Sequence, residues 1–78
     1  MQVLLKDSTS GLYYSGRDVR TADPFGAFDF CHIDRAARCA ASEMLAGMLI
    51  ILNYVHPPCQ LALSIDPHWN EPQQFQPN

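Results

Sequence analysis

Two short apolar runs lie near the start of the chain. Residues 2–6 (QVLLK) and 12–15 (LYYS) flank DSTSG, a run of turn-forming residues, and we predict a β-hairpin. Residues 16–29 contain two glycines, a proline and three aspartates. This composition predicts a loop, with room for one short extended piece around Val19.

Residues 33–45 follow the period of an amphipathic helix. Asp34 stands in the first turn, where the helix dipole favours a carboxylate, and it can pair with Arg38 four residues later. Gly47 is a suitable C-terminal stop. The apolar positions recur at helical spacing and define one face, made of Ile33, Ala36, Ala37, Ala40 and Met44.

Two further apolar segments predict strands. Residues 48–54 (MLIILNY) are continuously apolar, as in a strand covered on both faces, although a continuation of the helix is the alternative. Residues 60–66 alternate cleanly, which predicts an edge or half-exposed strand with Leu61, Leu63 and Ile65 pointing inward. After them comes a stretch rich in Pro, Gln and Asn.

The resulting order is strand, strand, helix, strand, strand, which predicts a small α+β domain with a mostly antiparallel sheet. We expect this domain to span residues 1–66 and residues 67–78 to form a mobile or loosely packed tail. One amphipathic helix covers only one face of a four-stranded sheet. The other face, which would carry Leu4 and Tyr13, must then be polar, hidden by the tail or buried against another subunit. A face that apolar predicts a homodimer.

Composition restricts the classes of function. A chain of 78 residues with 47% hydrophobic residues and a net charge of -3 is typical of one folded domain. Its five basic residues are outnumbered by eight acidic ones. Clustered Lys and Arg are what neutralise phosphates, so we expect no nucleic-acid partner.

The apolar runs and the cysteines indicate a compartment. The longest nearly apolar run, 44–55, is interrupted by Gly47 and Asn53 and is shorter than the roughly 20 residues that span a bilayer. The first residues have no basic region and too short an apolar run for a signal peptide. Three cysteines are an odd number, which argues against a disulfide framework. We expect a cytoplasmic protein with reduced thiols and no membrane partner.

Six cysteine and histidine residues are of types that bind zinc, so a zinc site has to be considered. Structural zinc sites draw paired ligands from short units such as C-x-x-C, and only HPPC, with His56 and Cys59, has such spacing. His32 and Cys39 would lie two turns apart on a helix, too far to share an ion. We therefore assign no metal ligands. The full set is Cys31, His32, Cys39, His56, Cys59 and His68.

Cysteine chemistry is the next possibility. Cys31 precedes the predicted helix and stands beside His32, and a nucleophilic thiol needs a helix N-terminus or a cation together with a base. Free cysteine is also among the most buried residue types, so we interpret Cys31 as a buried residue next to Phe30. Cys39 falls away from the apolar helical face, near Glu43, and we expect its thiol at the boundary of that face or exposed.

Tyrosines near basic residues raise a third possibility. Tyr13 and Tyr14, with Lys6, Arg17 and Arg20, have the residue types that stack on and neutralise a nucleotide or another anionic ligand. Two aspartates nearby cancel much of that charge. Aromatic residues are also ordinary strand formers, so we favour cross-strand packing.

The chain has no convergent set of acid, base, nucleophile and anion-binding groups, so we assign no catalytic or cofactor-binding residues and no cofactor. The function is best predicted as that of a non-enzymatic module that binds another protein or itself. The alternative is a small-ligand or metal-assisted activity that uses Cys31, His32, His56 and Cys59.

Overall fold

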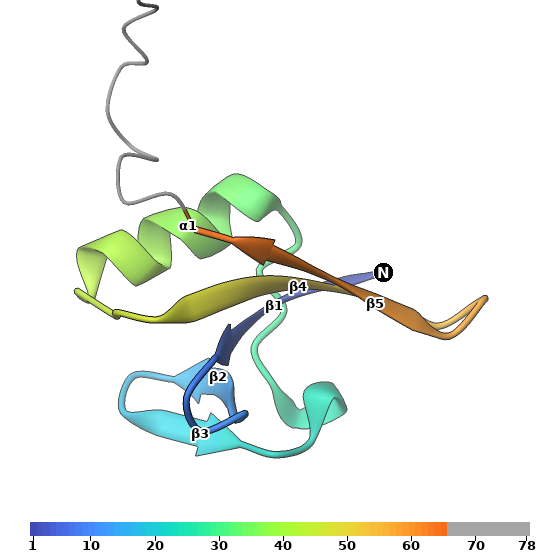
Figure 1. The fold of residues 1–78 in the computed structure, drawn as a ribbon, viewed down its shortest axis with the longest axis horizontal. Helices are drawn as coiled ribbons and strands as arrows, with labels where there is room; N and C mark the ends of the chain where they lie inside the picture. Colours follow the sequence, from blue (N-terminus) through green and yellow to red (C-terminus); the bar gives the residue numbers. More distant parts are fainter. Residues whose placement is uncertain (66–78) are drawn as a thin grey trace, which may run out of the picture.

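Five strands form one antiparallel sheet in the computed structural model, which describes residues 1–65 (Figure 1). The order across the sheet is β3-β2-β1-β4-β5, and a single α-helix packs on one face. The predicted α+β class is therefore confirmed. The elements in chain order are β1 (Gln2–Asp7), β2 (Tyr13–Gly16), β3 (Val19–Thr21), the 3-10 turn η1 (Pro24–Gly26), α1 (Ile33–Ser42), β4 (Met48–Tyr54) and β5 (Cys59–Ser64).

The sheet has one strand more than predicted. β3 returns from β2 through a tight turn in which Asp18 adopts a φ of 61°, a conformation that Asp tolerates better than most residues. Tyr14 pairs with Arg20, and the register shifts between Tyr14 and Gly16. The expected extended piece near Val19 is thus a paired strand.

β1 and β4 form the centre of the sheet. They pair in continuous register from Gln2 opposite Asn53 to Asp7 opposite Met48. Strands that are apolar on both faces are typical of the centre of a sheet. Val3, Leu4 and Leu5 are fully buried accordingly, although they point alternately to the two faces.

The main core lies between α1 and the sheet. Three alanines of α1 face the sheet, as predicted, and their small side chains let the helix lie close to β1 and β4. Burial of this apolar surface is the main driving force for the fold. The buried members of this core are Val3, Leu5, Tyr14, Phe30, Ala36, Ala37, Ala40, Met48, Ile50 and Leu52.

The helix ends three residues earlier than predicted. Past Ser42, Met44 adopts a φ of 55°, and its N–H donates to the carbonyl of Ala41 at 3.2 Å. The N–H of Leu45 donates to the carbonyl of Ala40 at 2.8 Å. These two bonds form a Schellman motif, which turns the chain away from the helix axis. Met44 is therefore 89% exposed, and its expected place on the buried face was wrong.

The second face of the sheet is covered by the chain itself. Leu4, Tyr13 and Ile51 are buried there, with Ala27 from the segment after η1 packed against them. The side-chain amide of Gln2 also donates to the carbonyl of Pro24 at 3.3 Å. The apolar part of this face is thus covered within the chain, so it no longer gives a reason for a dimer.

β5 forms where predicted, but its leucines are not inside. Leu61 is 51% exposed and Leu63 is 39% exposed. They pair with Leu52 and Ile50 and so lie on the helix side of the sheet. α1 packs mainly on β1 and β4, which leaves β5 uncovered. The inward position expected for both leucines was therefore wrong, whereas Ile65 is half-buried.

The tail expected at 67–78 lies outside the described residues and stays a prediction. Within residues 1–65, no helix is long and apolar enough to cross a membrane.

Candidate functional site

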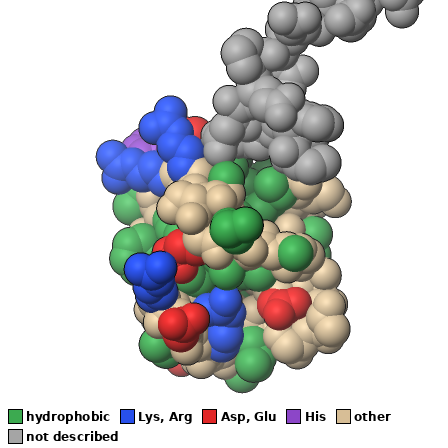
Figure 2. All heavy atoms as spheres, turned by 90° about the vertical axis from the view of Figure 1, so that its left-hand side faces the viewer, with side chains coloured by type: hydrophobic (Ala, Val, Ile, Leu, Met, Phe, Trp, Pro, Cys, Tyr) green, Lys and Arg blue, Asp and Glu red, His purple; other side chains and the backbone are tan. Residues whose placement is uncertain are grey.

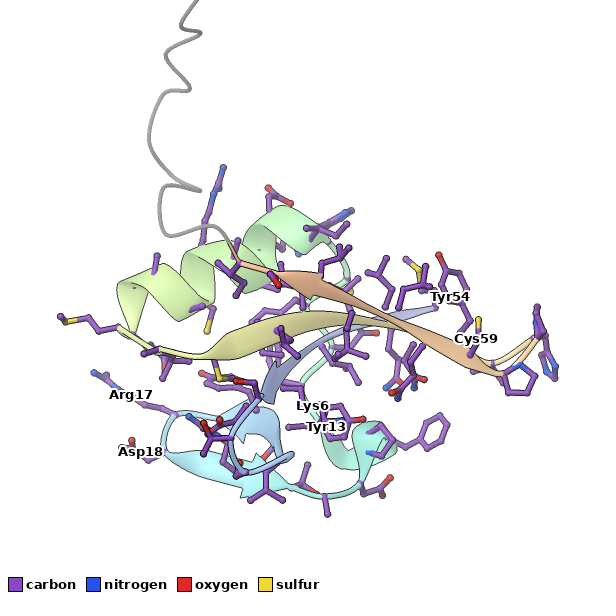
Figure 3. All side chains as sticks on the ribbon, viewed as in Figure 1. Lys6, Tyr13, Arg17, Asp18, Tyr54 and Cys59 are labelled. Carbon is purple, nitrogen blue, oxygen red and sulfur yellow. The ribbon has the colours of Figure 1, made fainter. Side chains whose placement is uncertain are left out.

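The four side chains of the metal or ligand hypothesis come from two parts of the fold. Cys31 and His32 precede α1, whereas His56 lies in the turn between β4 and β5 and Cys59 begins β5. Figure 3 shows Cys59 near Tyr54, its partner across the hairpin. Among residues 1–65, no three His, Cys, Asp or Glu side chains are placed to hold a metal together. The described geometry therefore does not support this hypothesis.

Cys31 is exposed, contrary to the prediction. Its φ of 70° turns the chain between the buried Phe30 and the start of α1. One carboxylate oxygen of Asp29 accepts from the N–H groups of Cys31 and Val3, both at 2.9 Å, and so fixes this turn against β1. The tight turn places the Cys31 side chain outside the core, which sequence spacing did not indicate.

A polar cluster joins the end of α1 to β2. The buried phenol of Tyr14 donates to Glu43 Oε2 at 2.7 Å, and the thiol of Cys39 donates to the same oxygen at 3.4 Å. Of the two positions expected for Cys39, the structure shows the boundary of the helical face and not the exposed one, because Tyr14 reaches this side of the helix and half-buries the thiol. The spacing of four residues between Cys39 and Glu43 was the only signal in the sequence.

The pKa shifts in this cluster do not favour a nucleophilic cysteine. The hydrogen bond to Glu43, followed by burial, raises the pKa of Tyr14 well above its usual range. Burial is also the main cause that raises the pKa of the Cys39 thiol. The bond from Tyr14 lowers the pKa of Glu43. A nucleophilic cysteine needs a lowered pKa, so we interpret this cluster as an anchor between helix and sheet.

The two tyrosines of β2 are each paired with a cation of the chain. Lys6 Nζ lies 5.5 Å from the ring centroid of Tyr13 (Figure 3), and Arg20 Cζ lies 5.2 Å from that of Tyr14. Neighbouring residues of a strand point to opposite faces, so the two pairs cannot clamp one ligand. Arg17 and Asp18 stand together at the β2–β3 turn (Figure 3). This arrangement fits the expected structural packing.

The face drawn in Figure 2 has no single cluster of basic side chains that would attract an anion. Figure 2 shows the face on the left of Figure 1, where basic side chains stand in separate places with acidic and hydrophobic ones between them. A surface of this kind lacks the single-sign field that steers nucleic acids or anionic substrates.

Amide side chains form a polar row across the second face. Asn53 Nδ2 donates to Gln2 Oε1 at 2.7 Å, and Gln60 Nε2 reaches Asn53 Oδ1 and the Tyr13 hydroxyl, both at 3.2 Å. The row ties β5 to the three strands beyond it. It satisfies the buried polar groups of Asn53 and Tyr13 and so has a structural role.

The surface with the strongest potential for binding is the outer side of β5. Within residues 1–65, no strand pairs with this side of Cys59–Ser64, which we call the β5 edge. All six residues are exposed, and none is charged or proline. Backbone N–H and C=O groups of alternate residues are thus free to pair with another strand.

The opposite edge of the sheet is protected. β3 has only three residues, carries Arg20, and lies beside the register shift in β2. Short length, a charge and a bulge are the devices that prevent edge pairing in natural proteins. β5 has none of them, and it adds the apolar surface of Leu61 and Leu63.

Comparison with protein-family models, curated proteins and solved structures finds no match. The function therefore has to be argued from the geometry described above.

Proposed function

We propose that this chain is a non-enzymatic protein-interaction domain that takes up a strand of a partner at the β5 edge. The observation that carries the proposal is the contrast between the two edges within residues 1–65, of which only β5 is long, uncharged and unpaired on its outer side. In strand addition, main-chain hydrogen bonds supply affinity and side chains on alternate positions supply selectivity. Leu61 and Leu63 would select apolar partners.

The remaining candidate sites support this choice. The cluster around Cys39 holds its thiol in the protonated form, and the two cation–tyrosine pairs are satisfied internally. No group of three metal-ligand side chains exists in residues 1–65. Binding at the β5 edge needs only backbone groups and exposed apolar side chains, and the described residues supply both.

We also propose a cytoplasmic location. The chain has three cysteines, and all three are free in the structure. Unpaired thiols that are exposed, such as Cys31 and Cys59, persist in a reducing compartment.

A charge placed on β5 tests the proposal. In the full-length Ala62→Lys variant, lysine stands at the centre of the β5 edge, where a charge opposes pairing. The matched control is Ala41→Lys, the same substitution at an exposed position of α1. Native mass is measured by light scattering from 5 to 500 µM, a range chosen to reveal weak association. If the protein associates, Ala62→Lys should abolish association and Ala41→Lys should not.

A peptide probe tests the edge when the protein is monomeric. The probe is a fluorescent peptide with the sequence of residues 58–65 and serine in place of Cys59, compared with a scrambled version. Binding of the first peptide, lost in Ala62→Lys and kept in Ala41→Lys, supports strand uptake. A monomer that binds neither peptide would overturn the proposed function, as would association that Ala62→Lys leaves unchanged.

A further inference from the structure

We infer that the strand taken up at the β5 edge is β5 of a second copy, which would join two five-stranded sheets into one antiparallel sheet. This inference rests on the proposed function and names its partner. The two strands would be related by a two-fold axis that passes beside Ala62. A closed, isologous contact of this kind is the commonest form of self-association.

Self-pairing fits the charge of β5. When a strand pairs with its own copy about a two-fold axis, a charged residue near the axis lies close to the same charge of the second copy, which destabilises the pair. Cys59–Ser64 contains no Asp, Glu, Lys or Arg. The edge therefore has no electrostatic barrier to its own copy.

The axis at Ala62 gives the best-matched pairs. Leu61 then lies opposite Leu63 of the second copy, and Gln60 lies opposite Ser64 of the second copy. Ala62, which has the smallest side chain in the middle of the strand, lies on the axis itself. An axis at Leu61 would instead place Ser64 opposite Pro58, which has no N–H to donate.

The same register explains the exposed leucines. Leu61 and Leu63 lie on the helix side of the sheet, beyond the part that α1 covers. Pairing at Ala62 would bring four leucines, two from each copy, into one strip between the two helices. Each leucine would gain an apolar neighbour on the side where it now meets solvent.

The residues that follow β5 are a weaker candidate for this edge. The sequence after Ile65 has proline at positions 67, 72 and 77, so no proline-free run between them exceeds four residues. Proline cannot donate a ladder hydrogen bond. A full six-residue partner for β5 is therefore better supplied by a second β5.

Disulfide cross-linking on full-length protein tests the register. In a Cys31→Ser, Cys59→Ser background, a cysteine is placed singly at position 60, 61, 62, 63 or 64 and oxidised mildly. Directly opposed residues in antiparallel strands have Cα atoms about 4.5–5.5 Å apart, within the range of a disulfide, whereas diagonal neighbours are about 7–8 Å apart. Ala62→Cys should therefore form a linked dimer at least ten times faster than Leu61→Cys or Leu63→Cys.

A mixing experiment provides an independent check. Gln60→Cys and Ser64→Cys proteins should cross-link with each other when mixed, and each should cross-link slowly alone. The background protein, which keeps only the half-buried Cys39, is the control for random oxidation.

The outcomes separate this inference from the proposed function. Fastest linkage at position 61 or 63 would overturn the register, and a monomer at every concentration, with no linkage above the background, would overturn the second copy as partner. In that last case, binding of the peptide probe would still support strand uptake from another protein.

Discussion

Substitution of Met44 by glycine should stabilise the protein, although it removes a large apolar side chain. Met44 adopts a φ of 55° at the end of α1, in the left-handed region that disfavours every residue with a Cβ atom. Its side chain is 89% exposed, so its removal forfeits little buried surface. The Schellman hydrogen bonds to Ala40 and Ala41 involve only the backbone and remain in the variant.

The size of the effect is a balance of two terms. The left-handed conformation costs a non-glycine residue roughly 1–2 kcal/mol. Glycine gives back about 0.4–1 kcal/mol of this, because it has more freedom to lose in the unfolded chain. At the middle of both ranges, the net gain for Met44→Gly is about 0.8 kcal/mol. For a domain of this size it corresponds to a rise in melting temperature of roughly 3–6 °C.

Urea unfolding followed by circular dichroism is the assay. Met44→Ala is the matched control, because it removes the same side chain but keeps the Cβ atom and hence the strain. Gly47→Ala should have the opposite sign, since Gly47 has a φ of 70°. If Met44→Gly were no more stable than Met44→Ala at an equal m-value, the reasoning about strain at the helix end would be refuted.

Three further predictions concern α1 and the groups around it. Ala40→Asp should destabilise the protein by more than about 3 kcal/mol, because it buries an unpaired charge. Arg38→Ala should cost about 0.5 kcal/mol or less, since its 3.8 Å contact with a carboxylate is exposed; equal losses in urea unfolding would mean that the helical face is misplaced. Cys31 should react quickly with a thiol reagent and Cys39 slowly, as labelling followed by peptide mass spectrometry can show; fast labelling of Cys39 would contradict its hydrogen bond to Glu43. The pKa of Glu43 is lowered, so its stabilising effect is present above the unfolded value of 4.5 and is lost as the pH falls through the folded pKa. The difference in stability between the unmodified protein and Glu43→Gln should therefore shrink as the pH falls below 4.5, and a constant difference would argue against the hydrogen bond that Glu43 accepts.

Periodicity predicted the parts of the fold that depend on burial alone. The alanines of α1 follow directly from the spacing of apolar residues. Met48–Tyr54 is a continuous apolar run, for which the sequence favoured a strand but left a continuation of the helix open, and the structure shows the strand. It could not predict the end of the helix, because Met44 adopts a conformation that its own propensity disfavours. The backbone hydrogen bonds of the Schellman motif hold it there, and no side-chain pattern records them.

The other wrong predictions concern residues whose burial depends on where a second segment packs. The alternation in β5 predicted which residues share a face, but the cover over that face depends on where α1 lies. Ala27 is similar, since an alanine in a loop rich in glycine and aspartate carries no signal that it packs on a sheet. The candidate binding edge was predicted as an edge or half-exposed strand. That β5 is the unprotected edge follows only from the strand order, which places β4 beside β1.

The central position of β1 has a consequence for synthesis of the chain on the ribosome. β1 precedes the other strands, yet its main partner is β4, whose register with β1 joins Gln2 to Asn53. The β1–β2 connection and α1 can form early, but the buried leucines of β1 have no complete cover until β4 has left the exit tunnel. Contacts between residues this far apart in sequence slow folding. The nascent chain therefore exposes the buried side chains of β1 until β4 emerges, and a chaperone that binds short apolar segments would find a target at residues 2–7.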